Sequence, residues 1–520
     1  MNRDEALQAA GAGGEWDVVV IGGGATGLGT ALDAVSRGYR TIVIEQADFA
    51  KGTSSRSTKL SHGGVRYLQQ GNVSLVLEAL KERGRMLRNA PHLVRRQGFV
   101  IPAYKSWEVP FYGVGLKVYD ALAGKASFGA SRMMGAAAVR ELMPTVTQRS
   151  LAGGVLYFDG QFDDARYAVA LAQTLTERGG VALNYARMVR LLKRGVKVCG
   201  VVARDEETGA EFELAAKVVV NATGVFTDEV RRLDEPGTAA LLTVSQGSHF
   251  VLPKAFLPGV HALMVPKTAD GRVLFAIPWH GAVVVGTTDD PVPGATLEPR
   301  AMRDETEFLR HHIGLYFGRE PEPADVLSMW SGLRPLVRKQ GAKSTAALSR
   351  EHTVLVSGSG LVSITGGKWT TYRRMAEDAV TIAAKSVGLP QRESATQEMR
   401  LHGWSEEAAA TGDLRVYGSD QGAMDALAAS SPELGMRLHE RLPFTGAEVV
   451  WATRHEMART VEDVLARRTR ALFLDARAAM EVTAKVAALM AAELGRDAAW
   501  EAQQVAAFRE LADGYVYRGA

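Results

Sequence analysis

The sequence predicts an α/β protein in which a discontinuous sheet domain is interleaved with a mixed-sheet domain and followed by an all-helical C-terminal domain. Three observations predict this arrangement. An apolar run at residues 18–21 leads through a glycine-rich turn into a helical stretch that ends at Gly38. The chain then leaves this unit and returns to it at a strand ending at Asn221. Beyond Pro390, alanine, glutamate and arginine dominate, and apolar residues recur at helical spacing.

The remaining elements follow from the periodicity of the apolar residues. Residues 51–71 are rich in serine, threonine, glycine and arginine, which predicts a loop. The predicted strands lie at residues 18–21, 41–44, 196–203, 212–214, 218–220, 283–286 and 353–357. The predicted helices lie at residues 73–93 and 165–178, from 368 to about 387, and within 391–520, where Val482, Val486, Leu489, Met490 and Leu494 keep helical spacing.

The glycine-rich turn has the spacing of a Rossmann-like dinucleotide site. Gly22 permits the tight turn, Gly24 lets the backbone approach a pyrophosphate, and Gly27 lets the helix lie close to the strand. Ala25 and Thr26 begin the helix whose N–H groups would hold the diphosphate, and Glu45 ends the next strand, where a carboxylate can bind ribose hydroxyls. The sequence therefore predicts dinucleotide binding.

The return of the chain indicates which dinucleotide is bound. A NAD dehydrogenase usually continues as a regular series of strand–helix–strand units, whereas this chain inserts other structure first. It then presents Ala222, Thr223 and Gly224, a small-residue turn suited to backbone packed against a nucleotide. A discontinuous nucleotide domain favours a flavin.

Composition excludes several function classes. The chain has 520 residues, 46% of them hydrophobic, and a net charge of +3, without a long run of one sign that would indicate a nucleic-acid-binding protein. Its single cysteine, Cys199, allows neither an internal disulfide nor a thiolate metal cluster, which fits a reducing compartment. No metal-ligand spacing of Cys and His is present. No apolar run reaches the roughly 20 residues of a membrane span, and residues 1–17 do not read as a secretory signal.

Several motifs are similar to those of FAD-dependent glycerol-3-phosphate dehydrogenases, and they cover nearly the whole chain. The turn and helix at residues 21–38 resemble the N-terminal signature of that family, and Gly366-Gly367-Lys368-x-x-Thr371-Tyr372-Arg373 resembles its second signature. Further matching segments occur in the order of the family at residues 59–68, 247–249, 286–289, 331–335, 454–458 and 462–468. Leu28 departs from the pattern, because the family usually has a small residue there.

The resemblance implies a fold of the glutathione-reductase and D-amino-acid-oxidase type with FAD as cofactor. It implies a FAD-binding domain at residues 1–85, 150–235 and 351–390, a substrate-binding cap at 86–149 and 236–350, and a C-terminal helical domain at 391–520. The implied reaction oxidises sn-glycerol 3-phosphate to dihydroxyacetone phosphate by hydride transfer to FAD. The insert of the peroxide-forming oxidases is not evident, which favours a bacterial dehydrogenase.

This reaction needs cations for the phosphate and one proton acceptor. By resemblance, the substrate pocket is lined by Arg66, Tyr67, His249, Arg334, Arg350 and Lys368. We expect His249 to be the general base, since imidazole accepts a proton near neutrality. Arg66 and Arg334 would orient the glyceryl hydroxyls or stabilise a developing alkoxide, while Arg350 and Lys368 would hold the phosphate.

Further cofactor contacts are implied by family position. Glycine and serine allow close backbone approach, and the expected residues are Ser54, Ser55, Ser57, His62, Gly63, Gly64, Gly367, Lys368 and Thr370. Lys368 follows a glycine pair at a helix start, where a cation is unfavourable unless an anion or a flavin carbonyl compensates it. Ordinary alternatives remain: the arginines in surface ion pairs, His249 as a satisfied histidine at a strand start, Tyr67 as a packed ring, and Asp163-Asp164 as a helix cap.

The electron acceptor implied by the resemblance is membrane quinone, reached by a cytoplasmic enzyme that lies peripherally on the inner face of the membrane. Residues 107–119 combine Trp107, Phe111, Tyr112 and Tyr119 with nearby Lys105, Lys117 and Lys125, a mixture typical of a segment that contacts anionic lipid. The alternative is an ordinary buried helix. A homodimer remains open.

Two other functions remain open. An oxidase of the same fold would pass the electrons to oxygen, and a catalytically silent flavoprotein would only bind or sense. Bleaching of the flavin by glycerol 3-phosphate, with or without peroxide release, separates the three.

Overall fold

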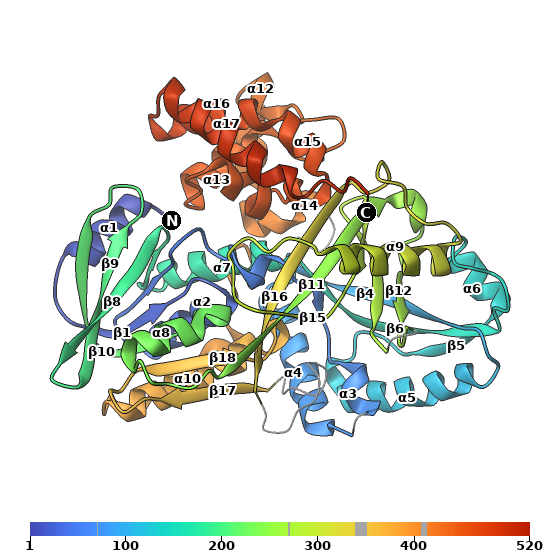
Figure 1. The fold of residues 1–520 in the computed structure, drawn as a ribbon, viewed down its shortest axis with the longest axis horizontal. Coiled ribbons are helices and arrows are strands. Elements are labelled where there is room, and N and C mark those ends of the chain that lie inside the picture. The colour runs from blue at the N-terminus through green and yellow to red at the C-terminus, as the bar shows by residue number, and fades with distance from the viewer. Residues whose placement is uncertain (70, 269–270, 339–350, 407–412, 520) are drawn as a thin grey trace.

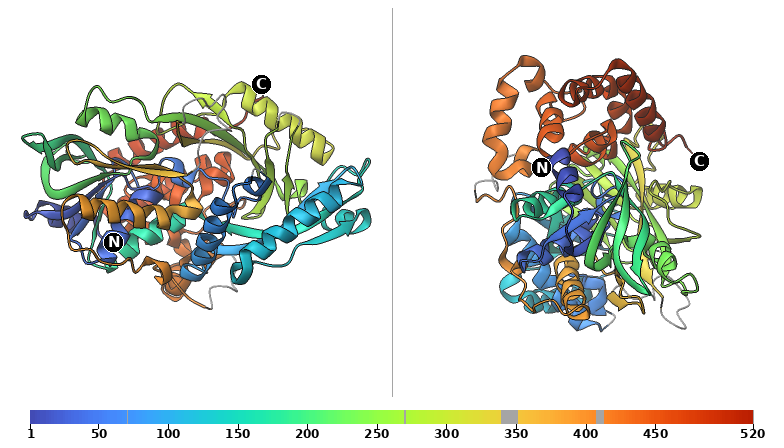
Figure 2. Two further views of the ribbon diagram at one scale, coloured as in Figure 1. Left: turned by 90° about the horizontal axis from the view of Figure 1, so that it is seen from below. Right: turned by 90° about the vertical axis from the view of Figure 1, so that its left-hand side faces the viewer.

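The computed structural model describes residues 1–69, 71–268, 271–338, 351–406 and 413–519. The described residues form two large sheets that lie next to each other, with the C-terminal helices above them in Figure 1 and in the right-hand view of Figure 2. Within this part of the chain, no helix is long and apolar enough to cross a membrane.

The first sheet has eight strands in the described residues, in the order β17-β18-β10-β1-β2-β7, with β8 and β9 attached through β10. Its strands are β1 (Trp16–Ile21), β2 (Thr41–Ile44), β7 (Val181–Leu183), β8 (Ala186–Arg194), β9 (Lys197–Asp205), β10 (Glu211–Asn221), β17 (His352–Val356) and β18 (Val362–Gly366). β1 pairs in parallel with both β10 and β2. Both faces of the parallel part are covered, which explains its continuous apolar runs such as 18–21.

Helices cover this parallel part. They are α1 (Arg3–Gly11), α2 (Ala25–Ser36), α7 (Asp164–Glu177), α8 (Thr227–Asp234) and α10 (Tyr372–Ser386). α2 contacts both α7 and α10. A Cβ at Gly29 of α2 would lie 2.8 Å from the Tyr372 ring, so this glycine lets α2 and α10 approach closely.

The second sheet has ten strands in the described residues, in the order β15-β11-β14-β13-β12-β4-β6-β3, with β16 paired to β11 and β5 to β6. Its strands are β3 (Leu60–Ser61), β4 (Val94–Ala103), β5 (Arg132–Gly135), β6 (Gly153–Phe162), β11 (Leu242–Pro253), β12 (Ala262–Val265), β13 (Leu274–Trp279), β14 (Ala282–Gly286), β15 (Asp290–Val292) and β16 (Ser328–Val337). The helices beside it are α3 (Val65–Gln69), α4 (Val73–Asn89), α5 (Glu108–Ala123), α6 (Ala136–Leu142) and α9 (Arg303–Phe317).

The structure differs from the sequence expectation in three places. β3 and β6 pair with each other in the second sheet, although residues 1–85 and 150–235 were assigned to the FAD-binding domain. Residues 51–71 form not only loop but also a 3-10 turn (Thr53–Ser55), β3 and α3, because Leu60 and Ser61 find partners on β6. The strands predicted at 212–214 and 218–220 are one strand, β10, which pairs with β9 in its first half and with β1 in its second.

The C-terminal segment is helical, as the sequence predicts. It contains α11 (Gln421–Ala429), α12 (Pro432–Gly435), α13 (Gly446–His455), a π-helical turn (Asp463–Arg468), α14 (Ala471–Leu474), α15 (Ala476–Glu481), α16 (Thr483–Leu494) and α17 (Ala498–Asp513). Val486 and Met490 are fully buried. Their cluster extends to Trp279 and Trp330 of the second sheet, so the helical domain shares its core with that sheet.

Candidate active site

The glycine-rich turn joins β1 to α2 and opens a cavity at the ends of the parallel strands. Gly22 has a left-handed φ of 109°, and a Cβ at Gly27 would lie 1.7 Å from the carbonyl oxygen of Gly22. Only glycine therefore lets α2 begin so close to β1. The Ser54 hydroxyl accepts a hydrogen bond from the Ala25 N–H at 2.9 Å, which ties the segment at residues 48–59 to the start of α2.

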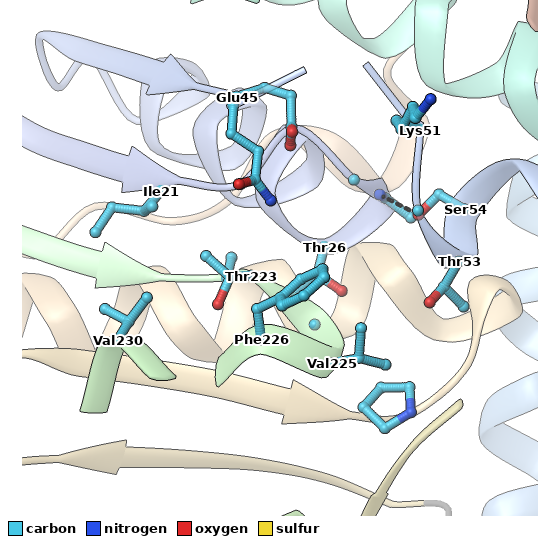
Figure 3. A pocket seen from close by; sticks show the side chains of 18 of the residues that line it. Ile21, Thr26, Glu45, Lys51, Thr53, Ser54, Thr223, Val225, Phe226 and Val230 are labelled. Atoms are coloured by element: carbon cyan, nitrogen blue, oxygen red, sulfur yellow. Dashed lines mark hydrogen bonds between the residues drawn. The ribbon is translucent and has the colours of Figure 1, made fainter. Parts of the chain in front are cut away.

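The cavity beside this turn has a volume of about 720 Å³ (Figure 3). Glu45 lies in its wall, where one carboxylate oxygen accepts a hydrogen bond from the Gly23 N–H at 2.6 Å and the other from the Ala47 N–H at 3.0 Å. Burial raises the pKa of Glu45, and these two hydrogen bonds oppose the rise. The glycine cradle, the helix N-terminus and the acidic strand end fit a dinucleotide such as FAD.

Most of the expected cofactor residues meet at this cavity. Its lining includes Gly22, Gly24, Ala25, Thr26, Glu45, Ser54, Ala222, Thr223, Gly224, Gly367 and Lys368. The expected residues outside the lining are Gly27, Ser55, Ser57, His62, Gly63, Gly64 and Thr370. The carbonyl of Ser55 instead accepts from Lys59, and the hydroxyl of Ser57 donates to Asp164 at 2.7 Å.

His249 lies on β11 and is 2% exposed. Its ring stacks on Trp330 of the neighbouring strand β16, with ring centres 4.0 Å apart, and its Nε2 is 3.0 Å from the Thr58 hydroxyl. Burial, together with the charges of Lys59 and Arg334, lowers the pKa of His249 well below its usual value. The imidazole is therefore neutral at pH 7, and the same lowering makes it a weaker base than an unburied histidine. Thr58 was missed by the sequence analysis, although it directly precedes a family-like segment.

Arg334 is positioned on β16 by residues of the family-like segment at 286–289. Its guanidinium donates to the Thr287 hydroxyl and the Thr288 carbonyl, each at 3.1 Å, and lies 3.3 Å from a carboxylate oxygen of Asp289. A Cβ at Gly247 would lie 2.2 Å from Nη2 of Arg334, so the glycine makes room for the guanidinium beside β11. Adjacent strands thus bring Arg334 and His249 together.

Lys368, which lines the 720 Å³ cavity, lies against the ring of Tyr67. Nζ of Lys368 lies 3.9 Å from the centre of the Tyr67 ring, and Lys368 also lines the 720 Å³ cavity together with Pro335, the neighbour of Arg334. Arg66 lies in α3, but its side chain is outside the described part of the structure, as is Arg350 altogether.

A network of buried ion pairs connects the segment at residues 48–59 to the C-terminal helices. Asp48 accepts hydrogen bonds from Arg468 at 2.7 and 2.9 Å and also pairs with Arg467. Lys51 pairs with Glu462 of the same C-terminal segment. Sequence analysis missed this network, since residues so far apart in the chain give no local signal.

A second part of this ion-pair network surrounds the carbonyl group of Ser55. Lys59 and Arg470 both donate to the Ser55 carbonyl, at 2.7 and 2.9 Å, and to Asp164, at 2.8 and 3.0 Å. Asp163 does cap α7, as the sequence predicts, by accepting from the Arg166 N–H at 3.1 Å. Burial and the charge of Arg470 lower the pKa of Lys59 to about 7. The C-terminal domain therefore fixes the segment that carries Ser54 and Thr58.

These features define a FAD-dependent oxidoreductase, and the comparisons with known proteins agree. A family model described as FAD dependent oxidoreductase matches residues 17–373, and one described as C-terminal domain of alpha-glycerophosphate oxidase matches residues 360–501. The mitochondrial glycerol-3-phosphate dehydrogenase of Arabidopsis thaliana is 41% identical, over 99% of this chain and 88% of its own length. The human mitochondrial enzyme is 40% identical, over 93% of this chain and 71% of its own.

The solved structures point the same way. Glycerol-3-phosphate dehydrogenase from Bacillus halodurans, complexed with FAD, superposes with a TM-score of 0.81 at 28% identity, covering 99% of this chain and 97% of the other. The chain belongs to the family of FAD-dependent glycerol-3-phosphate dehydrogenases. L-alpha-glycerophosphate oxidase from Mycoplasma pneumoniae, at 15% identity and a TM-score of 0.56, shares the fold over 75% of this chain and 98% of its own.

Proposed function

We propose that this protein oxidises sn-glycerol 3-phosphate to dihydroxyacetone phosphate and passes the two electrons through FAD to membrane quinone. The names of its relatives support the substrate. The observation that carries the proposal is a neutral buried imidazole, His249, on the strand next to that of a held guanidinium, Arg334, whose neighbour Pro335 lines the FAD cavity.

The reaction removes a hydride from C2 and a proton from the C2 hydroxyl, which together leave the ketone. FAD, when bound, supplies the acceptor for the hydride. We assign the proton to His249, whose Nε2 is held by Thr58. Arg334, already held by Asp289 and Thr287, would orient the hydroxyls or stabilise a developing alkoxide.

The phosphate needs further cations. Lys368 lines the FAD cavity together with Pro335, the neighbour of Arg334, and we assign it to the phosphate. We keep Arg350 as its partner on the phosphate and Arg66 as the partner of Arg334 on the hydroxyls. Tyr67 would close the pocket over the Lys368 ammonium. A substrate with one phosphate and two hydroxyls matches this division of charges.

Exposed side chains on α5 support a peripheral membrane site. The exposed fractions are 58% for Trp107, 54% for Phe111, 64% for Val114 and 46% for Val118, and their spacing puts all four on one face of the helix. Leu116 and Tyr119 on the opposite face are buried. Hence α5 is no ordinary buried helix. We propose that its exposed face lies on the anionic inner face of the membrane, where quinone is available.

The experiment that tests the function measures the acceptor. Purified holoenzyme is incubated with sn-glycerol 3-phosphate and, in turn, a soluble redox dye, a short-chain quinone and oxygen. We expect dye and quinone reduction that depends on the substrate, with little peroxide. Peroxide formed in equal amount to substrate oxidised would instead support the oxidase, which the match of the C-terminal domain to alpha-glycerophosphate oxidase keeps as second candidate.

A further inference from the structure

A second cavity, of about 540 Å³, lies between the second sheet and the C-terminal segment. Its walls come from β4, β6, the turn between β13 and β14, the segment at residues 254–261 and residues 415–416. It shares no lining residue with the FAD cavity. The proposed reaction makes no use of it.

Positive charge dominates the lining. It includes the cations Arg95, Arg96, Lys254 and Arg415, and among the described residues none of these four lies within ion-pair distance of a carboxylate. Among the described residues of the lining, the one carboxylate is that of Asp163, which lies 3.6 Å from Arg470 and 3.9 Å from His280. The buried arginines of the π-helical turn behave differently, since Arg467 and Arg468 both pair with Asp48.

Neutral groups hold the two guanidiniums that the cavity brings together. Arg415, in the C-terminal segment, donates through Nη2 to the Val94 carbonyl at 2.9 Å. Arg95, on β4, donates through Nε to the side-chain oxygen of Gln161 at 2.6 Å. Although Arg95 is an exposed residue as a whole, burial of its guanidinium lowers its pKa, and burial together with the charge of Arg95 lowers the pKa of Arg415. The two cations therefore repel each other without a described counter-charge.

Two buried nitrogen atoms in the lining lack a hydrogen-bond partner among the described residues. One is Nε of Arg415, and the other is Nδ1 of His92, a residue that is 2% exposed. Burial and the charge of Arg166 lower the pKa of His92 to about 3, so its ring is neutral, and its one N–H is hydrogen-bonded to the backbone of His402. Nε of Arg415 is therefore the unsatisfied donor, and because buried donors are ordinarily satisfied, it points to an acceptor that enters from the cavity.

We propose that this cavity binds a small oxyanion of the phosphate or phosphate-ester class, held by Arg95 and Arg415. Guanidinium groups match tetrahedral oxyanions through paired N–H donors, and the ligand would supply a negative charge and acceptors for Arg95 and Arg415. Because Arg95 belongs to the second sheet and Arg415 to the C-terminal segment, the bound anion would link the two. Free phosphate esters and lipid phosphate headgroups share this chemistry.

Calorimetric titration of the holoenzyme with inorganic pyrophosphate, at constant ionic strength, tests the proposal. The phosphate subsite of the active centre is a second candidate for the same probe, so the titration is repeated in Lys368→Gln. We expect one binding event to persist in Lys368→Gln and to weaken at least about tenfold in Arg95→Gln and in Arg415→Gln. Arg149→Gln, which removes an exposed cation outside the lining, is the matched control and should bind as the parent does.

The variants distinguish an anion site in this cavity from binding at the active centre. Binding that is unchanged in both Arg95→Gln and Arg415→Gln, or lost entirely in Lys368→Gln, overturns the proposal, whether or not the enzyme oxidises glycerol 3-phosphate. If Arg415→Gln does not fold, as judged by its flavin absorbance, the exposed Arg95 decides alone. A parallel arm uses phosphatidylglycerol vesicles: vesicle binding that depends on Arg95, without pyrophosphate binding, identifies a lipid headgroup as the source of the phosphate.

Discussion

At the scale of single residues, the environment of His249 decides how the reaction depends on pH. A base must be deprotonated, and burial has lowered the pKa of this imidazole well below its usual value. Acidification from pH 7.5 to 5.5 should therefore leave kcat/KM without an inflection near 6.5. The His249→Asn variant should lose about 10²- to 10⁴-fold in kcat while keeping its FAD. An inflection near 6.5 in the parent that vanishes in the variant would contradict the neutral buried ring.

Thr58 provides a second prediction at this scale. Its hydroxyl is the partner of Nε2, so Thr58→Val frees the ring to reorient while preserving the shape of the side chain. We expect kcat to fall about tenfold, the value of one hydrogen bond, with the FAD content unchanged. Thr58→Ser should restore most of the rate. Equal activity in Thr58→Val would show that Trp330 alone holds the ring.

Which residues could be predicted depends on how local their signal is. The roles of Gly22, Gly24 and Gly27 can be predicted because their spacing meets three steric demands within one turn. The role of Glu45 can be predicted because it ends the second strand of the same unit. Thr58 has no such pattern, since its partner lies on a distant strand of the second sheet. The Asp289 contact of Arg334 depends on the pairing of β11 with β15 and β16, which one sequence does not reveal.

At the scale of elements, the segment at residues 48–59 is held by the C-terminal helices rather than by its own sequence. Asp48→Asn would leave Arg467 and Arg468 buried with less negative charge, and breaking a buried pair costs about 3–5 kcal/mol. We expect a lower Tm and weaker retention of FAD. Asp513→Asn, which breaks an exposed pair with Arg518, is the matched control and should change little. A variant Asp48→Asn as stable as the parent would contradict the role of this network.

The ion pairs of Asp48 with Arg467 and Arg468 also predict how the free energy of unfolding changes in acid. Burial would raise the pKa of Asp48, but the charges of Arg468 and Arg467 prevail and lower it from 3.8 to about 2. Because the folded pKa lies below the unfolded one, this stabilisation is present above about pH 4 and is lost as the pH falls toward 2. The free energy of unfolding should drop steeply in that window, and less steeply in Asp48→Asn. Equal slopes would remove Asp48 from this effect.

At the same scale, the strands that differ from the sequence prediction do so for one reason. Pairing with strands distant in the sequence decides where a strand ends and which sheet it joins, and local composition does not show that pairing. β10 is one strand because β9 and β1 pair with successive halves of it, although its middle residues break the apolar run. β6 belongs to the second sheet because β4 pairs along its full length, although the expected FAD-binding domain included residues from 150 onward.

At the scale of the whole molecule, the net charge of +3 is too small to indicate a binding partner. The positions of the charged and apolar surfaces indicate how the protein would be oriented on a membrane. α5 and the C-terminal helices lie on opposite sides of the protein (Figure 1). If α5 lies on the membrane, the C-terminal domain projects away from it. The acceptor would then meet the enzyme from the side of the second sheet.

Sedimentation with phosphatidylglycerol vesicles tests this orientation. Combined replacement of Trp107, Phe111 and Val114 by serine should reduce vesicle binding by at least about tenfold, since each apolar side chain contributes on insertion. Val196→Ser, which removes a single side chain exposed to 75% elsewhere, should bind as the parent does. Unchanged binding by the triple variant, or a shift from dimer to monomer, would assign this face to another partner.

We propose that this chain oxidises sn-glycerol 3-phosphate at a FAD site. Anaerobic mixing of the oxidised holoenzyme with sn-glycerol 3-phosphate, followed by flavin absorbance, tests it most directly. We predict rapid and complete bleaching near 450 nm, about one dihydroxyacetone phosphate per flavin, and slower bleaching in His249→Asn and Arg334→Ala. A flavin that stays yellow with sn-glycerol 3-phosphate, in a protein that dithionite reduces normally, would contradict the account.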